Sequence, residues 1–314
     1  MAIITVGFNP AIDRILECPG FRAGAHQQAR LIARLAAGKS VNVSRVLAQL
    51  GMDSTAAGFV GGDEHAFFRT QLIAVGPGRV HCAFTEVSGH TRENISVVDP
   101  LTSVDTHLRD RGFTVTPAKA AALAQQLTDS VTTGDIVVFA GYLAEGMRAE
   151  YLGELMDLAI EEGARVVADT SGEPLRIAVS RPAWVLKPNL DEVRELFGDR
   201  VADEPAALAD AVRPLLERAE HVIITRSGAG AVLVTRHGAW SGCVAQHAPV
   251  VRTVGCGDHL LAGFIAELVA GRMPLDALRT GLAVATARAV SHDMARFDPE
   301  AMTAAARSVG IESL

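Results

Sequence analysis

The sequence predicts an α/β protein built on a mainly parallel central sheet with helices on both of its faces. Short runs rich in β-branched residues alternate with longer helical patterns along the chain. The middle runs are continuously apolar, which is typical of strands that are covered on both faces. The chain has 314 residues, of which 49% are hydrophobic, and this is enough to bury a large core.

The expected strands of the central sheet follow from these apolar runs. The first run lies at the N-terminus and ends in a polar turn without a basic segment before it, so a strand is expected there rather than a signal peptide. Strands are expected at residues 3–6, 55–59, 136–140, 165–169, 184–187, 222–225 and 231–235.

The expected helices lie between and after these strands. Gly51 marks the end of the first helix, and Pro205 and Pro274 stand at or before the starts of two others. Helices are expected at residues 41–50, 117–128, 147–162, 191–196, 205–219, 259–270 and 275–292.

Two regions interrupt the alternation. Residues 10–36 follow the first strand without an obvious helix, and two further strand patterns lie at residues 79–85 and 94–99, where we expect them to pair in a small separate sheet. We therefore expect residues 10–36 and 79–114, as approximate bounds, to form a lid at one edge of the core. No linker separates two domains, so residues 1–314 are expected to form a single domain.

The composition disfavours several classes of function. The formal net charge is −7, from 29 basic and 36 acidic residues, which argues against nucleic-acid binding. The longest apolar run, residues 136–144, is much shorter than the ~20 residues of a membrane-spanning helix, so no membrane association is expected. The four cysteines form no CxxC pair, and no Cys/His cluster has metal-ligand spacing. A reduced, cytoplasmic chain is therefore expected.

Residues 252–264 carry the strongest signal for chemistry. They read R-T-V-G-C-G-D-H-L-L-A-G-F, so that two glycines flank one small residue and Asp258 opens an apolar helix. Glycines let the backbone approach a bound group, and a helix start presents free N–H groups to an anion. Asp258 is placed there to accept a hydroxyl proton. The alternative is an ordinary turn in which Asp258 is the helix N-cap.

Residues 36–45 form a second glycine-containing segment, which reads A-A-G-K-S-V-N-V-S-R and leads into another apolar helix. The segment lacks the first glycine of a Walker loop. Lys39, near the helix start, is a candidate for binding a phosphate or a sugar oxygen. A solvated lysine before a helix is the alternative.

Together with three other motifs, these segments resemble the PfkB/ribokinase family of sugar kinases, and most closely its phosphosugar branch of 1-phosphofructokinases and tagatose-6-phosphate kinases. Residues 254–258 resemble the family's T-x-G-A-G-D signature, and residues 38–43 resemble G-G-K-G-x-N-x-A. Residues 9–13 match N-P-A-x-D, residues 91–94 match T-R-x-N, and residues 187–192 match K-P-N-x-x-E. The resemblance implies a ribokinase-like three-layer α/β/α fold with a small β-sheet lid.

The resemblance also implies roles in phosphoryl transfer from ATP. Asp258 would be the general base that takes a proton from a sugar hydroxyl as its oxygen attacks the γ-phosphate. The anion hole for the transferring group would be the backbone N–H groups of Gly255, Cys256 and Gly257. Mg²⁺ would be oriented, through water, by Asn189 and Glu192.

Two sets of binding residues follow from the same resemblance. Lys39 and Arg92 would bind a phosphate already present on the sugar, because Arg suits a phosphate with its planar fork. The sugar site would comprise Asp13, Gly38, Lys39, Asn42, Arg92 and Asn94. The nucleotide site would comprise Asn189, Thr225, Ser227, Gly228 and Gly230.

The chain departs from the family pattern at several positions. Residues 140–143 read A-G-Y-L where the phosphosugar branch has S-G-S-L-P in a loop that helps to receive the sugar phosphate. Ser227 stands where glycine is usual. The remaining departures are Ala37 and Ser40 in place of two glycines, Cys256 in place of alanine and His259 in place of serine.

The resemblance predicts a kinase that converts fructose 1-phosphate to fructose 1,6-bisphosphate. Tagatose 6-phosphate is the alternative substrate, and a non-catalytic sensor of a sugar phosphate or nucleotide is the alternative function. Residues 9–11 and Arg92 disfavour an unphosphorylated sugar or a nucleoside. The expected partners are a small sugar phosphate and a second copy of the chain, bound through the lid.

Overall fold

The architecture is that of a ten-stranded central sheet with helices on both faces, seen in a computed structural model that describes residues 1–102, 104–245 and 249–314. The strands of this sheet are β1 (Ile3–Gly7), β4 (Ser54–Gly61), β5 (Val80–Val87), β8 (Ile136–Ala140), β9 (Arg165–Asp169), β10 (Ala183–Leu186), β11 (Ala219–Thr225), β12 (Ala231–Thr235), β13 (Gly238–Val244) and β14 (Val309–Ser313). Their order is β14-β13-β12-β11-β10-β9-β8-β1-β4-β5. In this order the strands from β11 to β5 are parallel to one another. Each of β12, β13 and β14 pairs antiparallel with its neighbours.

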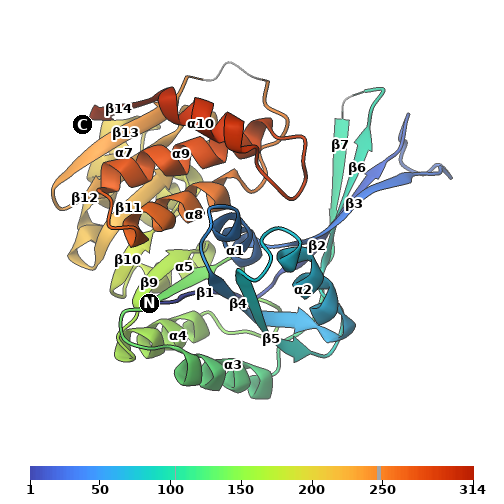
Figure 1. The fold of residues 1–314 in the computed structure, drawn as a ribbon, viewed down its shortest axis with the longest axis horizontal. Coiled ribbons are helices and arrows are strands. Elements are labelled where there is room, and N and C mark those ends of the chain that lie inside the picture. Colours follow the sequence, from blue (N-terminus) through green and yellow to red (C-terminus); the bar gives the residue numbers. More distant parts are fainter. Residues whose placement is uncertain (103, 246–248) are drawn as a thin grey trace.

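The helices form two layers around this sheet (Figure 1). One face is covered by α1 (Lys39–Gln49), α8 (Cys256–Val269), α9 (Pro274–Val290) and α10 (Pro299–Arg307). The other face is covered by α3 (Pro117–Ser130), α4 (Glu150–Glu161), α5 (Gly172–Ala178), α6 (Leu190–Phe197) and α7 (Pro205–Val212). Helix α2 (His65–Ile73) packs against β5, and three short 3-10 turns lie at η1 (Gly62–Glu64), η2 (Arg213–Glu217) and η3 (Ser227–Ala229). Within the described part of the chain, none of the helices combines the length and the apolar composition needed to cross a membrane.

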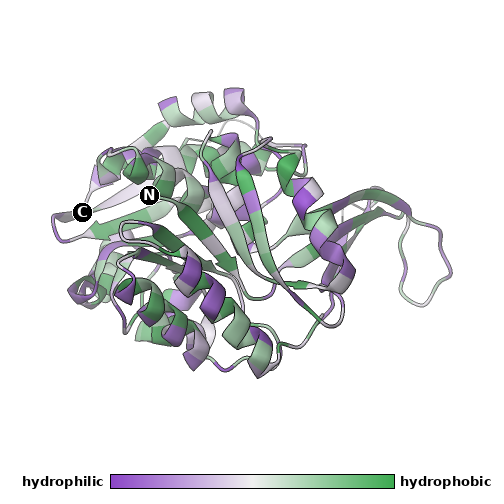
Figure 2. Cartoon of the chain, turned by 60° about the horizontal axis from the view of Figure 1, so that its bottom comes forward, coloured by the Kyte–Doolittle hydropathy of each residue, from purple (hydrophilic) through white to green (hydrophobic). Residues whose placement is uncertain are grey.

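The central strands are apolar on both sides because both sides are covered, as Figure 2 shows. In β8 the side chains of Val137 and Phe139 enter one core cluster, whereas those of Ile136 and Val138 enter the cluster on the opposite face. All four are fully buried. The alternation of side chains along a strand therefore supplies both layers of the core from one short run.

A four-stranded sheet, called the lid below, projects from one edge of the core (Figure 1). Its strands are β2 (Ala11–Glu17), β3 (Arg30–Ala37), β6 (Glu93–Asp99) and β7 (Val104–Arg109), in the order β3-β2-β6-β7. Strands β2 and β6 are parallel, with Asp13 opposite Asn94. Two segments that are about eighty residues apart are thereby joined at the base of the lid.

Two expectations from the sequence are wrong. Residues 79–85 do not pair with residues 94–99, because β5 adds to the central sheet beside β4, where Val80 and Phe84 pack with Phe68 and Leu72 of α2. The helix expected at residues 205–219 ends at Val212, since the chain turns into η2 around a proline that lacks an N–H group and then enters β11. The sequence patterns did not predict eight further elements, namely β2, β3, β7, β13, β14, α2, α5 and α10.

Gly58 in β4 is required by the close approach of β1. Its φ is 114°, and a Cβ built on it would lie 1.9 Å from the carbonyl oxygen of Gly7. Gly78 also has a positive φ, of 77°, but a Cβ there would meet no atom within 4 Å.

We therefore expect Gly58→Ala to lower the free energy of unfolding by about 3 kcal/mol, from strain and overpacking together. Gly78→Ala should lower it by about 1 kcal/mol from strain alone. Equal losses in urea unfolding of the two variants would contradict this explanation.

Candidate active site

The start of α8 presents Asp258 to a cleft between the lid and the core. Gly255 precedes the helix in the left-handed region, with φ of 83°, and acts as its N-cap, so Asp258 lies in the first turn. The Asp258 side chain is buried, and its Oδ2 accepts a hydrogen bond of 2.7 Å from Asn42 Nδ2 of α1. The alternative interpretation of Asp258 as the helix N-cap is therefore wrong.

Burial changes the acidity of this carboxyl group. Loss of water and the negative charge of nearby Asp169 together raise the pKa of Asp258 to about 6. Lys39 and Lys187 act in the opposite direction and limit this rise in pKa. Asp258 is therefore mostly ionised at neutral pH and is a stronger base than an ordinary carboxylate.

A buried ion-pair network lies beside Asp258. Asp169, at the carboxyl end of β9, has a fully buried side chain, and its two oxygens lie 2.8 Å from Lys39 Nζ and 3.0 Å from Lys187 Nζ. Burial alone would lower the pKa of Lys39, but the charge and hydrogen bond of Asp169, together with the charges of Glu192 and Asp258, outweigh this and raise it. Sequence reasoning assigned no role to Asp169 or Lys187. The signal that was available is a polar residue at the carboxyl end of a continuously apolar parallel strand.

The residues predicted to bind the sugar line one cavity of about 220 Å³. Asn94 Nδ2 donates to Asp13 Oδ1 at 2.8 Å, and Arg92 Nη1 donates to Asn94 Oδ1 at 3.0 Å, so these three side chains form a chain of hydrogen bonds across the base of the lid. The predicted residues that line this cavity are Asp13, Gly38, Lys39, Asn42, Arg92 and Asn94. The structure thus brings the whole predicted sugar set together.

The residues predicted to bind the nucleotide line a second cavity, of about 380 Å³. The predicted residues in its lining are Asn189, Thr225, Ser227, Gly228 and Gly230 from the core, and Gly255, Cys256, Gly257 and Asp258 from the start of α8. Ser227 has a φ of 49°, in the region that favours glycine, which explains why glycine is usual at that position. Burial raises the pKa of the Cys256 thiol to about 11, which fits a packed thiol.

The two cavities meet at three residues. Lys39, Gly255 and Asp258 line both of them. A hydroxyl group in the smaller cavity and an anion in the larger one would therefore both lie next to the Asp258 carboxylate. This arrangement suits the transfer of an anionic group between two small molecules.

Asn189 and Glu192, predicted to orient Mg²⁺, form a capping box at the start of α6. Asn189 Oδ1 accepts from the Glu192 N–H at 2.9 Å, and Glu192 Oε2 accepts from the Asn189 N–H at 2.8 Å. Asn189 lines the nucleotide cavity, whereas Glu192 is buried behind it and burial raises its pKa. Among the described residues, no group of three or more Asp, Glu, His and Cys side chains is placed to hold a metal ion. The oxygen donors present fit an Mg²⁺ ion that keeps its waters and the nucleotide's phosphates as ligands.

Two side chains that the motifs did not assign also line the sugar cavity. The ring of Tyr142, in the loop that departs from the family pattern, lies 5.7 Å from Lys39 Nζ. Arg109 of β7 stands opposite Asn94 in the lid. Neither belongs to one of the five motifs, so sequence patterns alone gave no reason to select them.

Comparison with known proteins agrees with this geometry. Residues 5–300 match the family described as pfkB family carbohydrate kinase. The chain is 32% identical to a 1-phosphofructokinase of Bacillus subtilis (strain 168), over 93% of this chain and 94% of that protein. It is 27% identical to a tagatose-6-phosphate kinase of Staphylococcus epidermidis, over 85% of each. Phosphofructokinase-2 from Escherichia coli, solved with substrates and products, has a TM-score of 0.90 at 22% identity over 98% of this chain and 99% of that one. This likeness concerns the fold alone, and the predicted ribokinase-like α/β fold is confirmed.

The raised pKa of Asp258 predicts a pH-dependent change in stability. The carboxyl group is easier to protonate in the folded chain, at a pKa of about 6, than in the unfolded chain, near 3.8. Folding is therefore penalised as the pH rises from about 4 to about 6, by about 2–3 kcal/mol once the group is ionised. Asp258→Asn should unfold at a higher urea concentration than the wild type at pH 8, and this gain should vanish near pH 4. Asp199→Asn, at an exposed carboxylate, is the control. A gain that is independent of pH would contradict the prediction.

Proposed function

Because the chain belongs to the pfkB family of carbohydrate kinases, we propose that it uses ATP to phosphorylate a ketose phosphate, with fructose 1-phosphate converted to fructose 1,6-bisphosphate. Relatives named 1-phosphofructokinase and tagatose-6-phosphate kinase support a phosphosugar substrate. The observation that carries the proposal is the position of Asp258, a buried and mostly ionised carboxylate at the junction of two cavities.

Asp258 acts as the general base in this proposal. It removes the proton of the sugar hydroxyl as that oxygen forms a bond to the γ-phosphorus of ATP and the bond to the bridging oxygen of ADP breaks. Asn42 holds the carboxylate through the 2.7 Å hydrogen bond to Oδ2, which leaves Oδ1 to face the hydroxyl. With a pKa of about 6, the base is available at neutral pH.

The start of α8 stabilises the transferring group. The N–H groups of Gly255, the N-cap, and of Cys256 and Gly257, in the first turn, lie where the helix dipole also favours negative charge. The Cys256 N–H makes a long hydrogen bond of 3.4 Å to the carbonyl oxygen of Thr253. Bound Mg²⁺, held with its waters near Asn189 and Glu192, would neutralise charge on the nucleotide's phosphates.

The sugar is held between the lid and the core. Asp13 and Asn94 are placed to bind its hydroxyl groups, and Arg92 and Lys39 its phosphate.

Four free cysteines, at positions 18, 82, 243 and 256, support a reducing environment such as the cytoplasm.

The lid also supports a homodimer. Among the described residues, the lid carries five exposed large apolar side chains, namely Leu31, Ile32, Leu101, Val104 and Leu108. We expect the chain to form dimers in light scattering and Leu108→Glu to form monomers, since a charge in an apolar interface is costly. Met273→Glu, at an apolar side chain exposed on the core, should remain dimeric. A monomeric wild type would refute the dimer.

A panel of acceptors tests the proposed reaction. ADP release is measured with Mg-ATP and fructose 1-phosphate, tagatose 6-phosphate, fructose 6-phosphate, ribose or adenosine. We expect the highest kcat/KM with fructose 1-phosphate. The variant Asp258→Asn should lose at least about 10³-fold in kcat and should still bind ATP, because only the base is removed. Turnover highest with tagatose 6-phosphate would select the alternative substrate. Thermal stabilisation by sugar phosphates without any ADP release would refute the kinase and indicate a sensor.

A further inference from the structure

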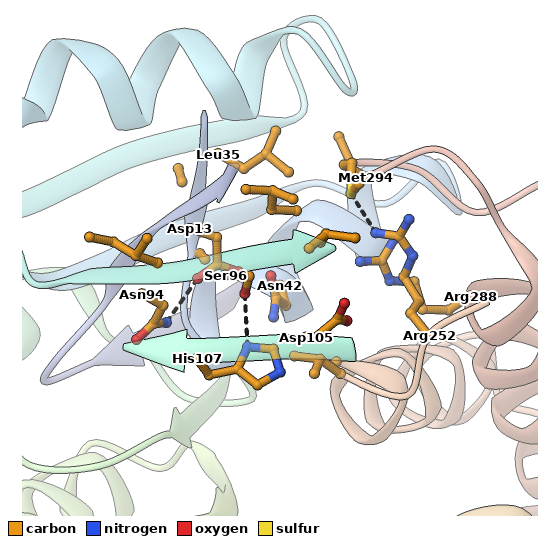
Figure 3. A pocket seen from close by; sticks show the side chains of 18 of the residues that line it. Asp13, Leu35, Asn42, Asn94, Ser96, Asp105, His107, Arg252, Arg288 and Met294 are labelled. Atoms are coloured by element: carbon orange, nitrogen blue, oxygen red, sulfur yellow. Dashed lines mark hydrogen bonds between the residues drawn. The ribbon is translucent and has the colours of Figure 1, made fainter. Parts of the chain in front are cut away.

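A third cavity, of about 380 Å³, lies beside the sugar cavity, between the lid and the ends of α1, α8 and α9 (Figure 3). The two cavities share Asp13, Asn42 and Asn94 as lining residues. From there the third cavity extends to a region that the proposed reaction does not use. Its far end is lined from the core by Arg45, His259, Arg252 and Arg288.

The three arginines bring positive charge to the cavity, and the carboxylates of Asp13 and Asp293 lie close enough to oppose it. None of them forms a salt bridge with a described residue. Arg252 Nη2 donates to the carbonyl oxygen of His292, and Arg288 Nη1 to that of Asp293. Burial lowers the pKa of Arg288, and the charge of neighbouring Arg252 lowers it further. Like charges gathered in one cavity favour an anion as its occupant.

The same cavity gathers buried polar atoms that lack partners. Among the described residues, the Nε atoms of Arg45, Arg252 and Arg288 and the Nε2 atom of His259 are buried without a hydrogen bond. The Gly255 carbonyl oxygen, 2.8 Å from His259 Nδ1, can only accept, so Nδ1 carries the proton and Nε2 is left as an acceptor. Buried polar groups are normally paired, so the described residues leave these side chains incompletely satisfied, and the His259 Nε2 acceptor suits a hydroxyl group rather than an anion.

The opposite wall, on the lid, carries polar side chains among apolar ones such as Leu35 and Val98. Ser96 Oγ and His107 Nδ1 are hydrogen-bonded at 2.9 Å, and Asp105 lies beside them on β7 (Figure 3). These groups suit the hydroxyl groups of a small molecule whose anionic group lies at the arginines. The volume of about 380 Å³ is within the range of small-molecule sites.

We propose that this cavity is a second anion site, which binds the phosphate group of a small phosphorylated molecule at Arg252 and Arg288. Guanidinium groups bind phosphate oxygens in pairs, and two of them face the cavity from one side. This site adjoins the sugar site, because Asp13 and Asn42 line both cavities, and the two arginines lie at the end away from these two residues.

Calorimetry with inorganic pyrophosphate, in EDTA and without ATP or sugar, tests the binding site. We expect Arg288→Gln to weaken pyrophosphate binding by at least about tenfold. Arg279→Gln, the same change at an exposed position of the same helix, should leave the affinity within about twofold. No binding to the wild type would overturn the proposal. So would a loss of affinity in Arg92→Gln but not in Arg288→Gln, which would place the anion in the sugar site.

A second variant keeps the test decisive if Arg288→Gln fails to fold. Asp105 is exposed on the lid, so Asp105→Asn should fold normally. It removes a negative charge from the cavity and should tighten pyrophosphate binding, whereas unchanged or weaker binding counts against the site. Because the affinity for pyrophosphate is measured without turnover, the result does not depend on whether the proposed substrate is correct.

Discussion

The site depends on one buried carboxylate held between two lysines. Asp169 ends β9, Lys39 opens α1, and Lys187 follows β10, so their ion pairs join three elements at the carboxyl edge of the sheet. Removal of Asp169 would leave both lysines without their buried partner, which is strongly destabilising. The same network sets the chemistry beside it, because Asp169 raises the pKa of Asp258 while both lysines oppose that rise. Structure and reactivity therefore depend on the same three side chains.

Much of the site could be predicted because its residues lie in short local motifs. Glycine turns and helix starts are determined by neighbouring residues, and the sets around Asp13 and Asp258 converge on two joined cavities. Strand partners could not be predicted in the same way. Residues 79–85 have a pattern that fits either sheet, and contact with α2, itself missed, places them in the larger one. Asp169 was missed for a related reason, since its importance arises from lysines about 130 and 18 residues away in the sequence.

Positive charge is concentrated where the proposed ligands lie, although the chain as a whole is acidic. The net charge is −7, yet the cleft between lid and core gathers Lys39, Lys187, Arg92 and the three arginines of the third cavity. A cleft with low-dielectric walls strengthens such a local field. Net charge consequently predicts which large partners the surface repels, and says little about the small anions that the interior accepts.

The order of strands in the sheet has a consequence for synthesis of the chain. Strand β1 is made first but lies near the middle of the sheet, where Ile3 pairs with Ile136 of β8, so the sheet cannot close around it until nearly half of the chain has been made. The helix that carries Asp258 begins only at residue 256 of 314. A nascent chain on the ribosome therefore holds Asp13 and Lys39 long before it holds Asp258. The two cavities that share Asp258 can form only after α8 has been made.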